Sequence, residues 1–487
     1  MSAETAVGQV GAYAAAAHDV FPAYAAAPAA ARAGLLESIA AGMESRSEAL
    51  VEIAAAETHL PPQRLAGEVV RTAYQLRAFA HLVRSGRHLR AVVEHTDPDY
   101  PVGGPAPDLR SMNRPVGPVA VFAASNFPFA FSVAGGDTAS ALAVGCPIIV
   151  KAHPGHPRLS EATAEIVCEA VRSHGFAPAV FSMVHGEQAG IRLLQHPAIR
   201  AAAFTGSTIG GRALFDVAAR RPDPIPFFGE QGSLNPVFVT AEAAHARVDD
   251  LATAFVASYT LGNGQLCTKP GLVFVPLGSG FAERAAAGVD GVGPARLLNE
   301  RIRSGYDAVG ETFTEVAGID VLRPGRADLE EVRPALFRTS MQTFLAHSDA
   351  LAEERFGPSA LVVEYDDPSD LLRAARAVGG TLTATVQASS STDRGIRELV
   401  EELALHAGRL VYNGWPTGVI VSPAMVHGGP YPATTSSGFT SVGARAVERF
   451  LRPVAYQGFP DDMLPDALSE CRAGDVPREV DLGRLLR

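Results

Sequence analysis

Cysteine is scarce in this 487-residue sequence, and the four cysteines are widely spaced. They are Cys146, Cys168, Cys267 and Cys471. Such irregular spacing provides neither a disulfide framework nor a zinc cluster, and it is typical of proteins in a reducing compartment. We therefore expect a cytoplasmic protein.

Long hydrophobic runs and blocks of like charge are also missing. The most apolar stretches, 118–124 and 139–150, are broken by Gly, Pro, Ser or Asn long before they could span a bilayer. No basic segment precedes an apolar one at the N-terminus, which argues against a signal peptide. The net charge of −11 is dispersed, without the basic stripe that nucleic-acid binding needs. We expect neither membrane nor nucleic acid as a partner.

What the sequence does contain is typical of a globular enzyme. Hydrophobic residues make up 47% and charged residues 19% of the chain, which excludes a wholly disordered protein. The chain is longer than chains that fold around a single hydrophobic core, so two or three domains are expected.

The pattern along the chain predicts helices followed by alternating strands and helices. Residues 12–87 are rich in Ala, with Leu and Glu at helical spacing, and the Pro- and Gly-rich tract 95–112 follows as an excursion. Strands are then expected at 116–123, 147–150 and 198–204, and helices at 137–144, 160–174 and 212–219. This alternation predicts a parallel sheet, and ligands bind at the carboxyl ends of such strands.

A second alternating region is expected from about residue 233. It includes a helix at 249–261, a strand at 271–275 and a helix at 368–378. The segment ERFLRPVAYQG, residues 448–458, is expected to add a strand, and the polar region beyond residue 460 is difficult to assign.

Cys267 stands apart from the other cysteines. It lies in the Gly-rich stretch GNGQLCTKPGLVFV, 262–275, between an expected helix and an expected strand. A nucleophilic thiolate needs an approach path for substrate and nearby backbone N–H groups, and a turn supplies both. Cys146 and Cys168 sit in apolar patterns and are expected to be small buried hydrophobic residues.

Several motifs resemble those of the aldehyde dehydrogenase superfamily. GQLCTKPG resembles the family's catalytic-cysteine signature, and PFFGEQGSLNPVFV at 226–239 resembles its second signature. The resemblance assigns Cys267 as nucleophile and Glu230 as general base, with Asn235 and Pro236 closing the second motif. SNFPF at 125–129 resembles the Asn-Phe-Pro turn, which implies that the Asn126 amide donates to the substrate oxyanion.

The same resemblance implies a nicotinamide-cofactor site. FTGS at 204–207 with a following Gly resembles the family's dinucleotide-binding loop, although a Gly pair alone is weak evidence. VKAHP at 150–154 implies that Lys151 bonds the adenosine ribose. EERFGPSALV at 353–362 implies that Glu354 holds the nicotinamide ribose and that Phe356 packs against it. The expected cofactor residues are Ser125, Lys151, Phe204, Gly206, Ser207, Gly211, Glu354 and Phe356.

The six motifs keep the family's order over about residues 110–440. They imply an α/β fold with a Rossmann-type cofactor domain, an α/β catalytic domain and a small oligomerisation region of strands. The implied boundaries are 1–94 with 116–232, 233–440, and 95–115 with 441–460, followed by a tail at 461–487. The implied oligomer is a homodimer or homotetramer.

The mechanism implied by the resemblance needs no metal. Cys267 attacks the aldehyde, hydride passes to the cofactor, and Glu230 activates water to hydrolyse the thioester. His153 and His156 have a spacing that suits metal binding, but a third ligand is missing and they lie in the cofactor segment. A CoA-acylating relative, or an inactive one serving as a binding protein, remains an alternative, against which the presence of Glu230 and Cys267 argues.

One subgroup of the family resembles this sequence over longer segments. The strings at 124–157, NGWPTG at 413–418 and HGGPYPATT at 427–435 are similar to bacterial enzymes that oxidise α-ketoglutaric semialdehyde (2,5-dioxopentanoate). NADP-linked fatty aldehyde dehydrogenases are similar in the same segments and remain an alternative.

The cofactor expected from the sequence is NADP in preference to NAD, with NAD still usable. Members that prefer NAD often carry a glutamate three residues after the conserved Lys, and this chain has Pro154 there. A carboxylate at that position would repel the additional phosphate of NADP. His156 and Arg158 follow, and we expect them to face such a phosphate; the alternative is that both are solvated residues at the start of a helix.

Overall fold

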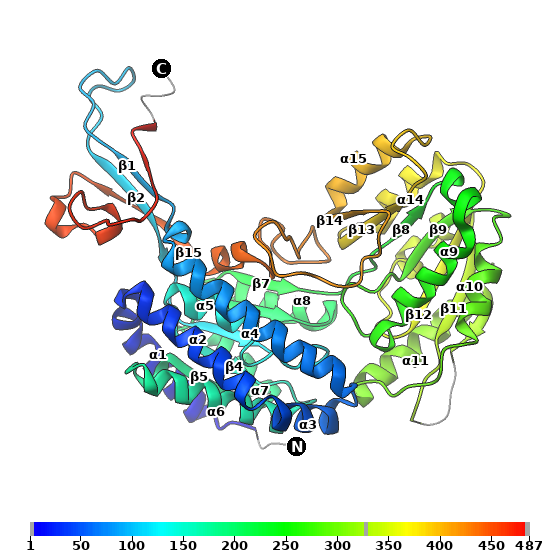
Figure 1. Ribbon diagram of the computed structural model, residues 1–487, viewed down its shortest axis with the longest axis horizontal. Coiled ribbons are helices and arrows are strands. Elements are labelled where there is room, and N and C mark those ends of the chain that lie inside the picture. Colours follow the sequence, from blue (N-terminus) through cyan, green and yellow to red (C-terminus); the bar gives the residue numbers. More distant parts are fainter. Residues whose placement is uncertain (1–3, 326–329, 483–487) are drawn as a thin grey trace.

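The computed structural model describes residues 4–325 and 330–482, which form two α/β lobes and a projecting arm (Figure 1). Each of the three parts is built on its own β-sheet. No helix among the described residues is long and apolar enough to cross a membrane.

The first lobe contains a five-stranded parallel sheet of order β5-β4-β3-β6-β7. Its strands are β3 (Val119–Phe122), β4 (Ile148–Lys151), β5 (Phe181–Val184), β6 (Ala201–Thr205) and β7 (Phe227–Glu230). The helices between them are α5 (Gly136–Val144), α6 (Pro157–Ser173), α7 (Glu187–Gln195) and α8 (Thr208–Ala219), with the short 3-10 turn η2 (Pro178–Val180). The expected parallel α/β fold is confirmed, and β5 and α7 add a unit that the sequence did not reveal.

Alternate residues of each strand face different cores, which fixes the layers of this lobe. On β3, Val119 and Val121 join one core, and Ala120 and Phe122 join the other. This follows from the two-residue period of a strand, and both faces are apolar because helices cover both.

The N-terminal helices confirm the expected helical region. They are α1 (Val7–Ala26), α2 (Ala29–Ser45), α3 (Ser47–Thr58) and α4 (Pro62–Arg84), and the turn η1 (Arg87–Leu89) follows. Leu36 of α2 and Leu76 of α4 pack in the core that contains Val119, whereas Val10 of α1 packs on the opposite face of the sheet. Small Ala side chains favour helix and allow these close approaches.

The second lobe contains a seven-stranded sheet of order β10-β11-β12-β9-β8-β13-β14, parallel except for β10. Its strands are β8 (Val237–Val239), β9 (Leu272–Pro276), β10 (Asp320–Pro324), β11 (Ala335–Ser340), β12 (Ser359–Tyr365), β13 (Thr381–Gln387) and β14 (Ala407–Tyr412). Its helices are α9 (Ala241–Thr260), η3 (Leu261–Gly264), α10 (Phe281–Val289), α11 (Glu300–Glu315), α12 (Met341–Ala346), α13 (Ser348–Leu351), α14 (Asp370–Val378) and α15 (Ile396–His406). The three elements expected in this region are all present. Helix α9 begins earlier than expected because the Thr240 side chain caps it by accepting from the Ala243 N–H at 3.1 Å.

The arm is a four-stranded sheet of order β15-β2-β1-β16 (Figure 1). Its strands are β1 (Ala91–Glu94), β2 (Leu109–Pro115), β15 (Leu451–Gln457) and β16 (Arg478–Val480), and the turns η5 (Asp461–Met463) and η6 (Asp466–Leu468) lie against it. The expected strand near the C-terminus is β15. The boundaries differ from expectation in two places: residues 91–94 pair with β2, and residues 461–482 pack on the arm rather than forming a separate tail.

A third boundary also shifts. Residues 444–450 form the turn η4 (Ala444–Phe450), whose Ala446, Val447 and Phe450 are buried in the core of the first lobe. Only the strand that follows belongs to the arm. These hydrophobic side chains are removed from water in that core, which explains the placement.

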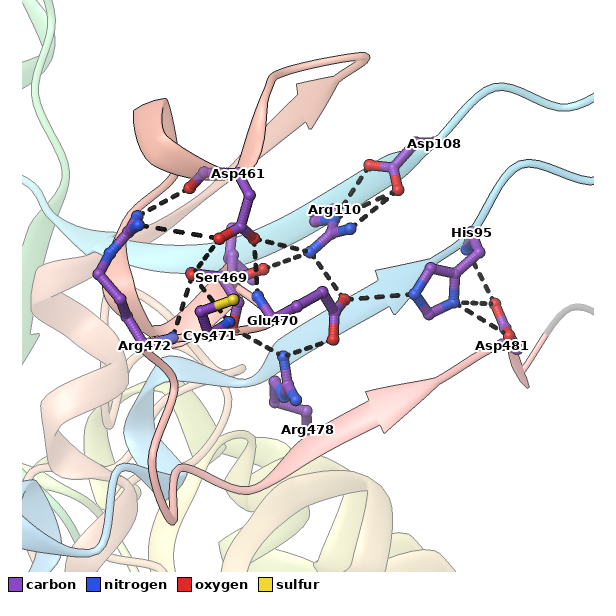
Figure 2. Close-up of polar contacts among 11 residues, drawn as sticks. His95, Asp108, Arg110, Asp461, Ser469, Glu470, Cys471, Arg472, Arg478 and Asp481 are labelled. Atoms are coloured by element: carbon purple, nitrogen blue, oxygen red, sulfur yellow. Dashed lines mark hydrogen bonds and ion pairs between the residues drawn. The ribbon is translucent and has the colours of Figure 1, made fainter.

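Polar contacts hold the C-terminal segment onto the arm (Figure 2). The Arg110 guanidinium of β2 lies 2.9 Å from Glu470 and also pairs with Asp108. His95 lies between Glu470, at 3.2 Å, and Asp481, at 3.1 Å. This network explains why a polar segment that was difficult to assign from sequence is ordered here.

Candidate active site

Cys267 lies in the loop between η3 and β9, at the junction of the two lobes. The loop bends sharply because Gly262, Asn263 and Gly264 all adopt positive φ. A side chain on Gly264 would collide with the backbone of Gly357, so glycine is needed at that close approach. The sequence prediction of a turn around Cys267 is confirmed.

Asn235 fixes the Cys267 loop through two hydrogen bonds. Its Nδ2 donates to the carbonyl oxygens of Cys267, at 2.8 Å, and Lys269, at 2.9 Å. Asn235 is fully buried, and its Oδ1 accepts from the Ser233 hydroxyl at 2.9 Å. The second signature, residues 226–239, therefore fixes the cysteine loop as well as supplying Glu230.

Three chemically active side chains converge at this point. The Sγ atom of Cys267 lies 3.4 Å from Nε2 of His427, and the same Nε2 lies 2.9 Å from Oε1 of Glu230. His427 is 1% and Glu230 3% exposed, whereas Cys267 is half-buried. A thiol, an imidazole and a carboxylate in this order can pass a proton between them.

Glu230 stands at the carboxyl end of β7 and is held by Ser441, whose hydroxyl donates to its Oε2. Burial favours the neutral acid, but His427 and Ser441 outweigh that effect and hold the pKa of Glu230 below its usual range. The side chain is thus a carboxylate at neutral pH, as a general base must be.

Cys267 has the opposite tendency. Burial raises the pKa of its thiol well above the usual value, and the charges of Glu230 and Glu354 add to this, while Arg71 opposes it. The resting group is therefore the thiol, and its activation requires a nearby proton acceptor. Cys146 is fully buried in the core of the first lobe, as expected. Cys168 packs against the same core but is only half-buried, so its expected full burial is wrong.

Asn126 follows β3 and approaches the cysteine loop. Its Nδ2 donates to the carbonyl of Gln265 at 3.1 Å, and the side chain is 8% exposed. A second hydrogen remains on the same nitrogen. Among the described residues the backbone N–H of Cys267 has no acceptor, so this N–H and the second Asn126 hydrogen both remain available as donors.

The expected cofactor residues of the first lobe lie along one edge of its sheet. Lys151, Phe122 and Phe204 are aligned in register at the carboxyl ends of β4, β3 and β6. Ser125 follows β3, and Gly206 and Ser207 follow β6. Ser207 caps α8 by accepting from the Gly210 N–H at 3.2 Å. A helix N-terminus at a parallel-sheet edge is suited to the phosphates of a dinucleotide.

Two glycines of this edge leave no room for a side chain. A Cβ on Gly206 would lie 2.6 Å from the Phe204 ring, and one on Gly211 would lie 2.6 Å from Gln231. Glycine at these two positions therefore lets the loop pack against Phe204 and Gln231 without a clash. The residues present fit a nicotinamide dinucleotide.

The remaining expected cofactor residues come from the second lobe. Phe356 packs against the core of the first lobe, and the Glu354 carboxylate lies against Gly232 and bonds the backbone of Ser233. Buried Lys269 donates at 2.7 Å to the carbonyl oxygens of Arg355 and Ser359, which fixes this segment. Burial lowers the pKa of Lys269, and Glu354 partly offsets this.

The expectation that His156 faces an added phosphate is wrong. His156 is fully buried, and its ring nitrogens contact the Ala124 carbonyl at 2.9 Å and the Ser160 hydroxyl at 3.2 Å. His153 stacks on it and accepts from the Gly155 N–H at 3.0 Å. Both ring nitrogens of His156 are therefore engaged within the protein, which leaves neither of them for a phosphate. Arg158 is exposed.

His427 is the functional residue that the sequence analysis did not assign. It belongs to HGGPYPATT, a string that served there only to mark a subgroup. The chain separation of 160 residues from Cys267 hid the contact. A histidine followed by two glycines, in a loop rich in Gly and Pro, was the available signal.

A small cavity adjoins the base. It has a volume of about 20 Å³ and is lined by residues including Glu230, His427 and Ser441. Nδ1 of His427 is buried and has no hydrogen-bond partner among the described residues. The cavity is large enough, and polar enough, for one water molecule.

Comparison with known proteins agrees with this geometry. The model of the aldehyde dehydrogenase family matches residues 2–287. The chain is 47% identical to "Alpha-ketoglutaric semialdehyde dehydrogenase 2" of Azospirillum brasilense, over 95% of this chain and 89% of that protein. It is 43% identical to "Alpha-ketoglutaric semialdehyde dehydrogenase" of Acinetobacter baylyi, over 92% and 86%.

Solved structures show the same fold at lower identity. A 1-pyrroline-5-carboxylate dehydrogenase from Thermus with bound NAD has a TM-score of 0.77 at 23% identity, covering 93% of this chain and 86% of that one. An NADP-dependent enzyme of E. coli has a TM-score of 0.78 at 23% identity, covering 93% and 90%.

Proposed function

The chain belongs to the aldehyde dehydrogenase family, and within it we propose that the substrate is 2,5-dioxopentanoate (α-ketoglutaric semialdehyde), oxidised to 2-oxoglutarate. The protein is an oxidoreductase that oxidises an aldehyde with a nicotinamide cofactor. The observation that carries the proposed chemistry is the contact of Cys267, His427 and Glu230 at the junction of the lobes. The two relatives named above support the substrate.

The first step activates the thiol. The Cys267 proton passes to His427 and is stabilised there by the Glu230 carboxylate, so that a thiolate attacks the aldehyde carbon. One S–C bond forms, and the carbonyl π electrons move onto oxygen. The Asn126 amide and the Cys267 backbone N–H would hold that oxyanion.

The second step oxidises the adduct. When bound, the oxidised nicotinamide accepts the hydride that leaves the former aldehyde carbon. Collapse of the oxyanion leaves a thioester on Cys267. Glu354 and Phe356 would position the nicotinamide ribose, and Lys151 the adenosine ribose.

The third step releases the product. Glu230, held ionised by His427 and Ser441, takes a proton from water as the water attacks the thioester. The S–C bond breaks, the carboxylic acid leaves, and Cys267 regains a proton. A base beside the thioester favours water over CoA as the acceptor, and it argues against a silent relative.

We propose further that NADP is preferred, with NAD usable. Exposed Pro154 supports this, because it brings no carboxylate toward an added phosphate. Steady-state kinetics on one aldehyde test the preference, and a kcat/KM for NAD roughly tenfold above that for NADP would refute it.

We also propose a cytoplasmic homodimer or homotetramer assembled through the arm. The arm projects away from both lobes in Figure 1 and exposes apolar side chains such as Tyr100, Val102 and Phe459. Light scattering of the purified protein tests this, and a monomer at micromolar concentration would contradict it.

The substrate proposal is tested by a purified-enzyme screen with both cofactors, with and without CoA. We expect 2,5-dioxopentanoate to give the highest kcat/KM, formation of 2-oxoglutarate, and no dependence on CoA. A long-chain aliphatic aldehyde as the best substrate would favour the alternative of a fatty aldehyde dehydrogenase.

A further inference from the structure

Two arginines of α4 face the same region of the active site. Arg64 and Arg71 are about two helical turns apart, so they lie on one side of the helix. Their guanidinium carbons lie 5.2 and 5.8 Å from the centre of the Phe127 ring, which belongs to the turn that carries Asn126. Arg71 also lies over Phe131, at 5.3 Å.

Both guanidinium groups have a buried nitrogen without a partner. Nη1 of Arg64 and Nη1 of Arg71 make no hydrogen bond to the described residues. Arg64 uses Nη2 to donate to the Asn126 carbonyl at 2.6 Å, and Arg71 makes only a long contact of 3.4 Å to the Val419 carbonyl. Buried polar groups are normally satisfied, so these two nitrogens indicate a ligand.

A third arginine near the thiol provides a contrast. Arg409 of β14 donates to the Thr383 hydroxyl at 3.2 Å, to the Gly418 carbonyl at 2.8 Å and to the Pro416 carbonyl. All three of its nitrogens are engaged in holding the 416–418 loop. Arg409 is therefore structural, whereas Arg64 and Arg71 retain unused donors.

The two arginines lie close to the reacting atoms. Phe131, over which Arg71 lies, has its ring centre 6.4 Å from that of His427, the residue that contacts the Cys267 thiol. A Cβ added to Gly262, in the turn before Cys267, would lie 3.1 Å from Nη1 of Arg64. The region between the guanidinium groups thus adjoins both the nucleophile loop and Asn126.

Two carboxylates lie near these arginines, and both are held by other donors. Glu68 lies between the arginines on α4 and is 5% exposed, but its Oε1 accepts the N–H groups of Phe129 and Ala130, at 2.8 and 2.9 Å. Burial raises the pKa of Glu68, and these backbone bonds and the two arginines oppose the shift. Glu230 also acts on Arg71, but it is held by His427 and Ser441. The two Nη1 donors therefore remain available to an anionic group.

We propose that Arg71, with Arg64, binds the carboxylate of the substrate and makes the enzyme selective for aldehydes that carry an acid group at the far end of a short chain. This rests on the proposed function, in which 2,5-dioxopentanoate is such an aldehyde. The planar guanidinium offers two parallel N–H donors to a carboxylate.

The test compares kcat/KM for glutarate semialdehyde with kcat/KM for pentanal, which has the same chain length and no charge. The variants are Arg71→Met, Arg64→Met and the double variant, because Met preserves packing on Phe127 while removing the donors. We expect the anionic-to-neutral ratio to fall roughly a hundredfold in Arg71→Met and further in the double variant. Arg71→Lys should give an intermediate ratio, since it keeps the charge but loses the paired donors.

Arg77→Met is the matched control. Arg77 lies on the same helix but pairs with exposed Glu44, at 2.6 Å, away from the site, so its ratio should equal that of the wild type. If the double variant keeps the wild-type anionic-to-neutral ratio, the carboxylate subsite is overturned and the proposed substrate is not. A wild-type enzyme with no preference for the anionic aldehyde would contradict both this subsite and the proposed substrate. If a Met variant fails to fold, the anionic-to-neutral ratio of Arg71→Lys is the test. An unchanged ratio in that variant would overturn recognition of the carboxylate by the paired donors of Arg71.

Discussion

His427 places its Nε2 atom 2.9 Å from Oε1 of Glu230, and both side chains are almost fully buried. The same nitrogen contacts the Cys267 thiol, so the base of the proposed hydrolysis is connected to the nucleophile through an imidazole. The pKa of Cys267 is raised and that of Glu230 is lowered, so a protonated thiol lies beside an imidazole that contacts a carboxylate. The imidazole can therefore accept the thiol proton.

Replacing His427 should therefore slow acylation and change its pH dependence. In His427→Asn we expect the pre-steady-state burst of reduced cofactor to slow by about a hundredfold. Its rate should rise roughly tenfold per pH unit in the neutral range, because only the spontaneously ionised thiol then reacts. The wild-type burst should depend less steeply on pH, because His427 is then present to take the thiol proton. Stopped-flow fluorescence measures both.

The control for this experiment is His245→Asn, on the exposed side of α9. Its burst rate and pH profile should match the wild type. A His427→Asn burst as fast as the wild type would show that the thiol loses its proton by another route.

Cys267→Ala should lose aldehyde oxidation by several orders of magnitude while still binding the cofactor, because the covalent route is removed. Cys168→Ala, in a half-buried cysteine of the first lobe, should remain active. Steady-state rates and cofactor titration by fluorescence provide the data. A tenth of wild-type activity in Cys267→Ala would exclude this residue as nucleophile.

Lys269 is expected to position the cofactor through Glu354. The chain has only two lysines, Lys151 and Lys269, and both lie in the candidate site. Lys269→Met would leave the buried carbonyls of Arg355 and Ser359 unpaired, at a cost of about 1–3 kcal/mol each. We expect a lower Tm and a KM for the cofactor raised roughly tenfold, with a smaller effect on kcat. An unchanged cofactor KM together with a lowered Tm would reduce Lys269 to a purely structural residue.

Zinc should inhibit the enzyme rather than activate it. Ligand atoms of Cys267, His427 and Glu230 all lie within 4.8 Å of one another, a donor set that suits zinc. Bound zinc would remove the thiolate and the base together, so we expect reversible inhibition that a chelator relieves. Prolonged dialysis against the chelator alone should leave activity unchanged. Loss of activity on dialysis, restored by zinc, would contradict the metal-free mechanism.

The sequence predicted the parts of this structure that depend on local pattern. The apolar runs of β3 and β4 and the turn at Cys267 were identified correctly because strand burial and Gly-rich turns leave short-range signals. Strand β5 was missed, since its four residues FSMV differ little from a loop. The role of the C-terminal segment depends on ion pairs with β2 that no local pattern encodes (Figure 2).

The site divides in the same way. Family-like motifs predicted Cys267, Glu230 and Asn126, and the structure brings all three to one junction. His427 was not predicted, because its contact with Cys267 joins residues that are 160 positions apart. Arg71, proposed above to bind the substrate, was not predicted either, because it meets Phe127 and Phe131 only in the folded chain. The wrong assignment of His156 has the converse cause: spacing placed it near the cofactor loop, but its ring turns inward to the Ala124 carbonyl.

The most direct test of the account is to trap the thioester. Glu230→Gln keeps the size of the base and removes its negative charge, so oxidation should proceed once, more slowly than in the wild type, and then stall. We predict about one reduced cofactor per active site and an acyl adduct on the peptide that carries Cys267, detected by mass spectrometry after acid quench. Continued turnover without an adduct, or an adduct on exposed Cys471 instead, would contradict the account.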